Sequence, residues 1–112
     1  SDFTHFTSYV SLVKNKECAY NFGIRDSISQ LHYLCMKCKG DGTINISIKN
    51  ENGKTMLPKT NCKTTNWKWI KISIPEKNIS SGNNTITFQD AKGTVDIDKF
   101  VITTNEKLNP DK

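Results

Sequence analysis

The sequence predicts an all-β fold, an antiparallel β-sandwich in a single domain, from three observations. Apolar residues recur with a period of two in most segments, as they do on half-buried strands. Turn-forming residues recur at intervals of about ten residues, which is typical of short strands joined by tight connections. No long segment shows the 3.6-residue period of an amphipathic helix. The chain of 112 residues is long enough for one hydrophobic core and too short for two.

The alternation predicts strands, in chain order, at residues 18–24, 31–38, 44–48, 64–74, 82–88 and 95–102. In the fourth of these, isoleucines occupy every second position from Ile70 to Ile74 and should face the core. In the last strand, Lys99 interrupts the alternation between Ile97 and Phe100, so we expect a β-bulge there.

Segments rich in glycine, asparagine and aspartate separate these strands, at residues 40–42, 50–53, 81–84 and 92–93. These residue types tolerate positive φ or close a turn through their side chains, so we expect turns at these places. Residues 105–112 are polar and end in Asn-Pro-Asp-Lys, which is typical of a linker or a frayed tail. We therefore expect a β-sandwich domain at residues 1–104 and a C-terminal tail at residues 105–112.

The charge pattern argues against a nucleic-acid-binding protein. Lys and Arg total 16 against 11 Asp and Glu, a formal net charge of +5, but Arg25 is the only arginine. Proteins that bind phosphates or base edges usually use the bidentate guanidinium group, and the lysines are scattered along the chain as on a solvated surface. No segment approaches the ~20 apolar residues that cross a bilayer, so membrane insertion is not expected either.

Four cysteines (Cys18, Cys35, Cys38 and Cys62) and three glycosylation sequons, which begin at residues 45, 78 and 83, favour a secreted or cell-surface protein. Cys35 and Cys38 have the spacing of a zinc or redox pair. A zinc site would need a second such pair, and a redox cysteine would need a helix N-terminus, so two structural disulfides are the preferred interpretation. Positions 35 and 38 of a strand point to opposite faces, so these cysteines should bond to different partners, in an order that the sequence leaves open.

The sequence contains no convincing catalytic group, so we expect no enzyme. His5 and His32 are the only histidines, and neither accompanies a serine or cysteine nucleophile motif. Asp96 and Asp98 lie two positions apart on one strand face, which suits a cation or a solvated surface at least as well as acid–base catalysis.

Residues 64–74 carry the most informative functional signal. If the isoleucines face the core, Trp67 and Trp69 point away from it. An exposed indole ring is costly to leave in water, so something should cover it. Loops and lysine side chains are one candidate cover, which we favour for Trp69; a sugar ring stacked on the indole is an equally good interpretation for Trp67.

The order of these features resembles the carbohydrate-binding modules of families 6 and 35, which are galactose-binding-like β-sandwiches. The resemblance extends over most of the chain. It rests on Tyr9 in an early aromatic loop, the Asn52-Gly53 hairpin, the Thr64-x-x-Trp67 strand, the strand that begins at Gly82, and the final Val-Asp-Ile-Asp strand at residues 95–98. The resemblance implies a jelly-roll sandwich of about eight or nine strands, with sugar bound in loops at one end.

The resemblance also implies a set of site residues. Tyr9 and Trp67 would form the two walls of the sugar site, with Trp69 beside them, and Asn66 and Thr94 would hydrogen-bond to sugar hydroxyls. The asparagine that these families usually carry near the start of the last strand is missing from residues 91–94.

Members of these families often hold a structural calcium ion between acids of a first strand and an aspartate of the last strand, which here is Asp98. The opening segment supplies only Asp2 as a second acid, so this calcium site is incomplete, and no other cofactor is expected.

These features together predict a non-catalytic, lectin-like module, a monomeric part of a larger secreted or surface protein that binds a glycan or glycoprotein. Four cysteines are unusual for the bacterial modules and point to a eukaryotic surface protein. The alternative is a galactose-binding-like adhesion module that has lost the sugar site and binds another protein.

Overall fold

The computed structural model describes residues 4–6, 10–12, 17–24 and 31–109, with side chains for the last two ranges. Its strands are β1 (Thr4–Phe6), β2 (Val10–Leu12), β3 (Glu17–Ile24), β4 (His32–Asn50), β5 (Gly53–Met56), β6 (Thr60–Ile74) and β7 (Gly82–Thr103), with a single 3₁₀ turn, η1 (Glu76–Asn78). All the strand pairs among these residues are antiparallel.

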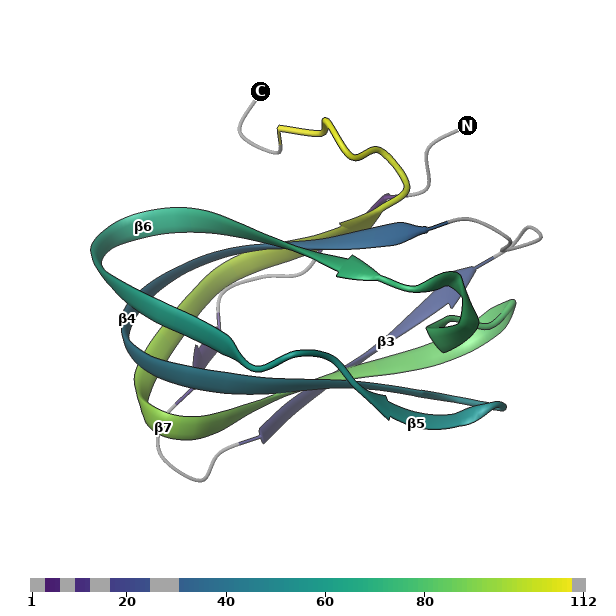
Figure 1. Cartoon of the computed structure of the whole chain (residues 1–112), viewed down its shortest axis with the longest axis horizontal. Coiled ribbons are helices and arrows are strands. Elements are labelled where there is room, and N and C mark those ends of the chain that lie inside the picture. Colours follow the sequence, from purple (N-terminus) through teal and green to yellow (C-terminus); the bar gives the residue numbers. More distant parts are fainter. Residues whose placement is uncertain (1–3, 7–9, 13–16, 25–30, 110–112) are drawn as a thin grey trace.

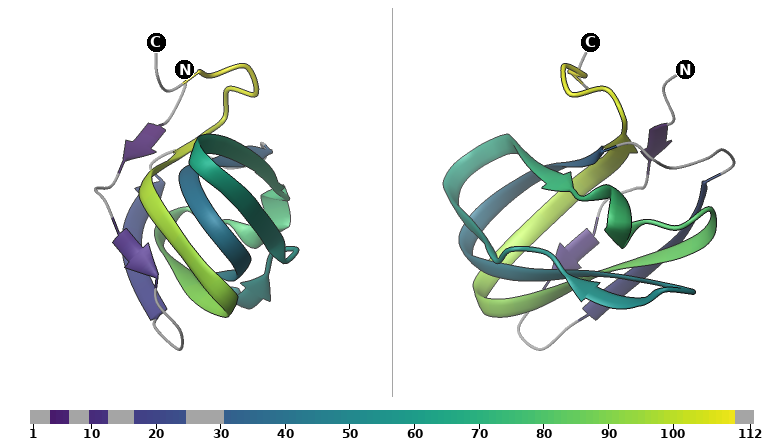
Figure 2. Two further views of the ribbon diagram at one scale, coloured as in Figure 1. Left: turned by 90° about the vertical axis from the view of Figure 1, so that its left-hand side faces the viewer. Right: turned by 45° about the vertical axis from the view of Figure 1, so that its right-hand side comes forward.

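Three long strands, β4, β6 and β7, bend at one end of the molecule and return, so one sheet folds into two facing layers (Figure 1). The first half of β4 pairs with the second halves of β6 and β7 in the upper layer. Its second half pairs with β5 and with the first half of β7 in the lower layer. The short strands β1 and β2 and the longer β3 pair with β7 (Figure 2).

The predicted antiparallel β-sandwich is confirmed, although the described strands are fewer and longer than expected. Residues 31–38 and 44–48, expected as separate strands, belong to the single strand β4, and residues 82–88 and 95–102 both belong to β7. The glycine-rich segments between them bend the strands instead of ending them. At Gly40, an added Cβ would lie 2.3 Å from the Thr94 carbonyl oxygen, so β4 and β7 can approach this closely only because the residue has no side chain.

Two bulges shape the upper layer. Lys37 lies opposite Lys99 but Cys38 lies opposite Ile97, so Asp98 is an extra residue in β7, which confirms the bulge expected next to Lys99. The second bulge is in β6. Cys38 lies opposite Lys68 and Gly40 opposite Thr64, so residues 65–67 of β6 face the single residue Lys39.

The core lies between the two layers and is filled from alternate strand positions. Ile74 is fully buried, and Ile70 and Ile72 are partly buried against the core, so the row of isoleucines faces inward as predicted. The rings of Phe88 and Phe100, one from each half of β7, meet with centroids 5.0 Å apart. His32 is 2% exposed on the inner side of β4, which fits a structural role; the side chain of His5 lies outside the described residues.

All four cysteines are thiols in this structure. The two expected disulfides, drawn from Cys18, Cys35, Cys38 and Cys62, are therefore not formed in it. Cys35 and Cys38 do take opposite faces, as their spacing in β4 requires: Cys38 belongs to the core cluster, whereas Cys35 is buried outside it. In the described part of the chain, no helix is long and apolar enough to cross a membrane.

Candidate functional site

The two tryptophans lie on the outer face of β6, because the alternating isoleucines occupy its inner face. Trp67 is 37% exposed and is one of the few large apolar side chains of the described residues that lie at the surface. Trp69 is half-buried and is therefore the less exposed of the two rings. The outward orientation predicted for both rings is confirmed.

Lysine side chains from neighbouring strands lie over both rings. The Lys39 ammonium is 4.7 Å from the centroid of Trp67, and the ammonium groups of Lys37 and Lys99 are 6.0 Å and 5.8 Å from the centroid of Trp69. These distances are within the range of cation–π attraction, which contributes about 0.5–1 kcal/mol at exposed sites.

The C-terminal segment lies above β6 (Figure 1) and adds further cover to Trp69. Lys71 donates a hydrogen bond to the backbone oxygen of Glu106. Leu108 and Trp69 line a crevice of about 270 Å³ together with Cys35 and Lys71. Trp69 is thus packed by protein groups, in line with the interpretation favoured for it, and Trp67 is the more accessible ring.

The β6 bulge holds Trp67 at the bent end of the sandwich. Within it, the Thr64 hydroxyl donates a hydrogen bond to the Asn66 carbonyl oxygen at 2.9 Å and accepts one from the Asn66 backbone N–H at 3.2 Å. These two short-range bonds fix the bulge locally. The residue expected to hydrogen-bond to sugar, Asn66, therefore lies exposed beside the ring expected to stack on it.

An open hollow of about 710 Å³ lies beside this bulge, on the three bent strands. Its lining residues are Lys39, Gly40, Asp41, Lys63, Thr64, Thr65 and Asp96. Two lysines, two aspartates and two threonines thus line one volume, and Lys39 belongs both to the hollow and to the cover of Trp67. Such a mixture of donors and acceptors suits a polyhydroxylated ligand.

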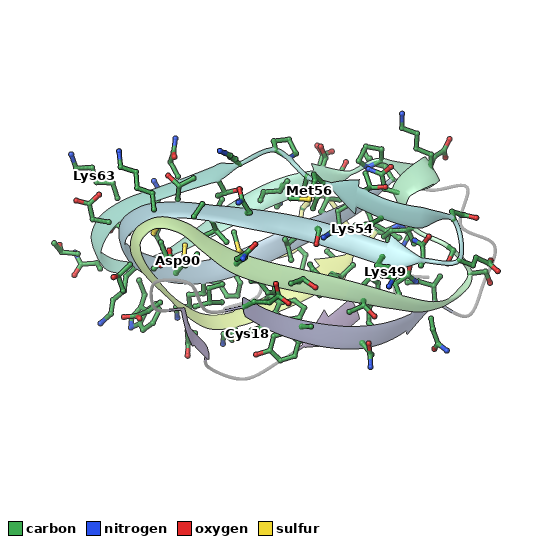
Figure 3. The ribbon with its side chains drawn as sticks, turned by 90° about the horizontal axis from the view of Figure 1, so that it is seen from below. Cys18, Lys49, Lys54, Met56, Lys63 and Asp90 are labelled. Atoms are coloured by element: carbon green, nitrogen blue, oxygen red, sulfur yellow. The ribbon has the colours of Figure 1, made fainter. Side chains whose placement is uncertain are left out.

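A second hollow, of about 510 Å³, lies on the same bend and shares Asp41 and Lys63 with the first. It is also lined by Thr43 and Asn61, whose side chains hydrogen-bond to each other at 3.0 Å. Lys63 projects from this end of the molecule (Figure 3).

The structure brings some of the predicted site residues together. Asn66 and Trp67 share the bulge, and Thr94 lies exposed on β7 opposite Asp41, at the same bend. Tyr9, the predicted second wall, lies outside the described residues, as does Asp2. Asp98 forms the β7 bulge, and the described residues contain no group of three acids, histidines or cysteines that could hold a metal ion.

Sequence reasoning missed the hollow itself. The sequence did mark the bend, because Gly40, Asp41 and Gly42 are turn-forming residues. These residues were expected to connect two separate strands. The strands instead continue through the bend, which places Lys39, Lys63 and Asp96 from three strands around one hollow.

No protein-family model and no curated protein sequence matches the chain. The similarities found are to solved structures. The C-terminal family 6 carbohydrate-binding module of LamC, a laminarinase from Zobellia galactanivorans, is 16% identical with a TM-score of 0.65, over 92% of this chain and 99% of that one. A family 29 carbohydrate-binding module, CBM29-2, is 14% identical with a TM-score of 0.57, over 96% and 100%.

Two further similar structures are longer chains. A β-porphyranase of glycoside hydrolase family 86 from Bacteroides plebeius has a TM-score of 0.70 at 11% identity, over 92% of this chain but only 20% of its own. The module named BiXyn10A CBM1 is 20% identical with a TM-score of 0.60, over 86% of this chain and 69% of its own. The described residues therefore share the β-sandwich fold of these carbohydrate-binding modules, the fold that the sequence resemblance implied.

Proposed function

We propose that this chain is a non-catalytic carbohydrate-binding module that stacks a sugar ring on Trp67. The observation that carries the proposal is the exposed indole ring placed by the β6 bulge beside a hollow lined by residues with hydrogen-bonding side chains. A likeness to modules that are named for carbohydrate binding supports it.

The chemistry of the site matches that of a pyranose. One face of a sugar ring presents C–H groups that pack on an aromatic ring, while its edge carries hydroxyls. In the proposed complex, the apolar face lies on Trp67 and the hydroxyls reach the carboxylates of Asp41 and Asp96, which accept, and the ammonium of Lys63, which donates. Asn66, Thr94 and Tyr9 remain proposed contacts, and Trp69 is proposed to support the platform from beside it.

We place the module in a larger extracellular or cell-surface protein, as a unit that brings its parent chain to a glycan. A similar structure occurs within a larger enzyme, since the chain matches only a fifth of the porphyranase. In this role the module needs no cofactor and acts as a monomer.

One observation favours the alternative, a protein-binding module of the same fold. The ammonium of Lys39 already lies 4.7 Å from the centroid of Trp67, and a lysine stem that stayed there would cover the ring against a sugar. In that case Trp67 holds Lys39 in place by cation–π attraction, and the exposed surface of the module binds another protein.

A glycan array probed with the wild-type chain and with Trp67→Ala distinguishes the two functions. We expect the wild type to bind a defined set of glycans and Trp67→Ala to bind them about tenfold or more weakly, since an aromatic contact contributes about 0.5–1.5 kcal/mol beyond the burial of its area. Met56→Ala is the matched control, because Met56 is an exposed apolar residue on β5, away from the bend (Figure 3). Absence of binding by a folded wild type across a broad array would favour the alternative.

A further inference from the structure

Cys38 and Cys62 form a buried thiol pair inside the bend. The two residues are 0% and 2% exposed and belong to the same core cluster. In the β4–β6 ladder, Cys38 lies opposite Lys68 and Cys62 lies opposite Gly42, on the two sides of the β6 bulge. Both cysteines therefore belong to the core beside the bend, one on each side of the bulge, although they are not ladder partners, and the Cys62 thiol is near enough to raise the pKa of Cys38.

The other two cysteines are kept apart by the sheet. Cys35 lies opposite Lys71 and Val101 and lines the crevice with Leu108, on the outer side of the upper layer. Cys18 lies on β3 in the lower layer (Figure 3), where it packs against the core. A bond between them would need Cys35 to turn to the inner face, which requires a register slip of one residue along its strand.

We infer that Cys38 and Cys62 close a single disulfide under oxidising conditions, while Cys18 and Cys35 stay thiols. In this step two S–H bonds break and one S–S bond forms. The two protons and two electrons reduce a small-molecule disulfide such as oxidised glutathione, which leaves as two thiols. The inference does not depend on the proposed sugar binding.

The bond would join the two strands that build the hollow beside Trp67. Cys38 immediately precedes Lys39, and Cys62 immediately precedes Lys63, and both lysines line the hollow. A covalent link at these positions ties β4 to β6 across residues 65–67, so it also restricts the bulge that carries the indole ring.

The bond is expected to close during folding and not afterwards. Both residues are almost fully buried, which excludes a bulky oxidant from the folded protein. Burial and the neighbouring Cys62 thiol also raise the pKa of Cys38 from 9.0 to about 12, so its reactive thiolate is scarce near neutral pH.

Peptide mapping tests the inference directly, because cleavage after lysine and arginine places each cysteine on a different peptide. The reduced chain is refolded with mixed reduced and oxidised glutathione, its remaining thiols are alkylated in denaturant, and the digest is analysed by mass spectrometry. We expect one cross-link, between Cys38 and Cys62, and alkylated Cys18 and Cys35. Four alkylated cysteines, two disulfides, or a bond with any other pairing would overturn the inference.

Variants and thermal unfolding provide an independent measurement. Cys62→Ser is expected to abolish the cross-link, and the matched control Cys18→Ser is expected to leave it unchanged. Oxidation should raise the Tm of the wild type by an amount on the order of 10 °C, because the bond restricts the unfolded chain between residues 38 and 62. An unchanged or lower Tm on oxidation would contradict a bond that fits the native geometry.

Discussion

Gly40 and Gly53 both have positive φ, at 130° and 113°, but their surroundings differ. A Cβ at Gly40 would lie 2.3 Å from the Thr94 carbonyl oxygen, whereas a Cβ at Gly53 would meet no atom within 4 Å. We expect Gly53→Ala to cost about 1 kcal/mol for its backbone conformation alone. Gly40→Ala should cost about 3 kcal/mol or more, because β4 and β7 must also move apart.

Chemical denaturation of both variants checks this difference. Equal losses of unfolding free energy would mean that the close approach at the bend contributes nothing to stability. A larger loss for Gly40→Ala would show that the bend, and with it the hollow, depends on a position without a side chain.

Asn84 organises the end of the sandwich opposite the bend. Its side-chain oxygen accepts hydrogen bonds from the Ser80 backbone N–H at 3.0 Å and from the Asn50 side chain at 2.9 Å, and its nitrogen donates to the Ser80 carbonyl oxygen at 2.9 Å. Because Asn84 is 1% exposed, Asn84→Ala leaves buried partners unsatisfied and should cost about 2–3 kcal/mol in unfolding free energy. The neighbouring exposed Asn83→Ala is the control and should change the unfolding free energy by less than about 0.5 kcal/mol; similar losses in the two variants would contradict this account.

At the scale of the strand, the β6 bulge offers a test that separates fold from site. Residues 65–67 occupy the space opposite Lys39, so β6 carries two more residues than a regular ladder would need there. Deleting Thr65 and Asn66 keeps the alternation of β6, because two residues equal one full period. We expect the deletion variant to keep its circular dichroism spectrum and its cooperative unfolding but to lose glycan binding on the array.

Two outcomes would contradict this expectation. If the deletion variant binds glycans as the wild type does, the bulge does not build the site. If it fails to unfold cooperatively, the bulge is required by the fold, and the separation of fold from site is wrong.

The elements that the sequence predicted correctly are those with a strict alternation. The isoleucines of β6 could be assigned to the core, and the indole rings to the outside, from the period of two alone. The bulge in β7 could be predicted because Lys99 interrupts a clear alternation. The β6 bulge could not, because residues 64–66 are all small and polar and show no break in a pattern.

The sequence also did not show that β4 and β7 are continuous strands. Gly40, Asp41 and Gly42 have the composition of a turn, and only the close approach of β7 distinguishes a bend from a chain reversal. The cover of Trp69 by the C-terminal segment depends on Leu108, a single apolar residue in a polar stretch. Contacts between distant segments decided both features, and no local pattern encodes them.

For the molecule as a whole, the buried thiols link stability to pH. Burial raises the pKa of Cys38 to about 12, and it also raises the pKa values of Cys35 and Tyr20. The folded state thus keeps protons that the unfolded chain releases above about pH 9. The stability of the reduced protein is therefore expected to be complete below about pH 9 and to fall as the pH rises towards 12.

Thermal unfolding of the reduced and oxidised proteins across this range measures the effect. A Tm of the reduced protein that stays constant or rises above pH 9 would contradict the assignment of buried thiols. When Cys38 is in a disulfide, it has no thiol proton to release. The oxidised protein should therefore lose less stability than the reduced one over the same pH range.

The central claim, that Trp67 is the platform of a glycan site, is tested most directly by nuclear magnetic resonance. The chain has 2 tryptophans, so its proton–nitrogen spectrum contains one indole N–H signal for each, and Trp69→Phe assigns them. On titration with a glycan identified by the array, we expect the Trp67 signal to shift saturably and the Trp69 signal, from the ring packed by two lysines and the C-terminal segment, to shift less. Saturable glycan binding that leaves the Trp67 signal in place would contradict the claim.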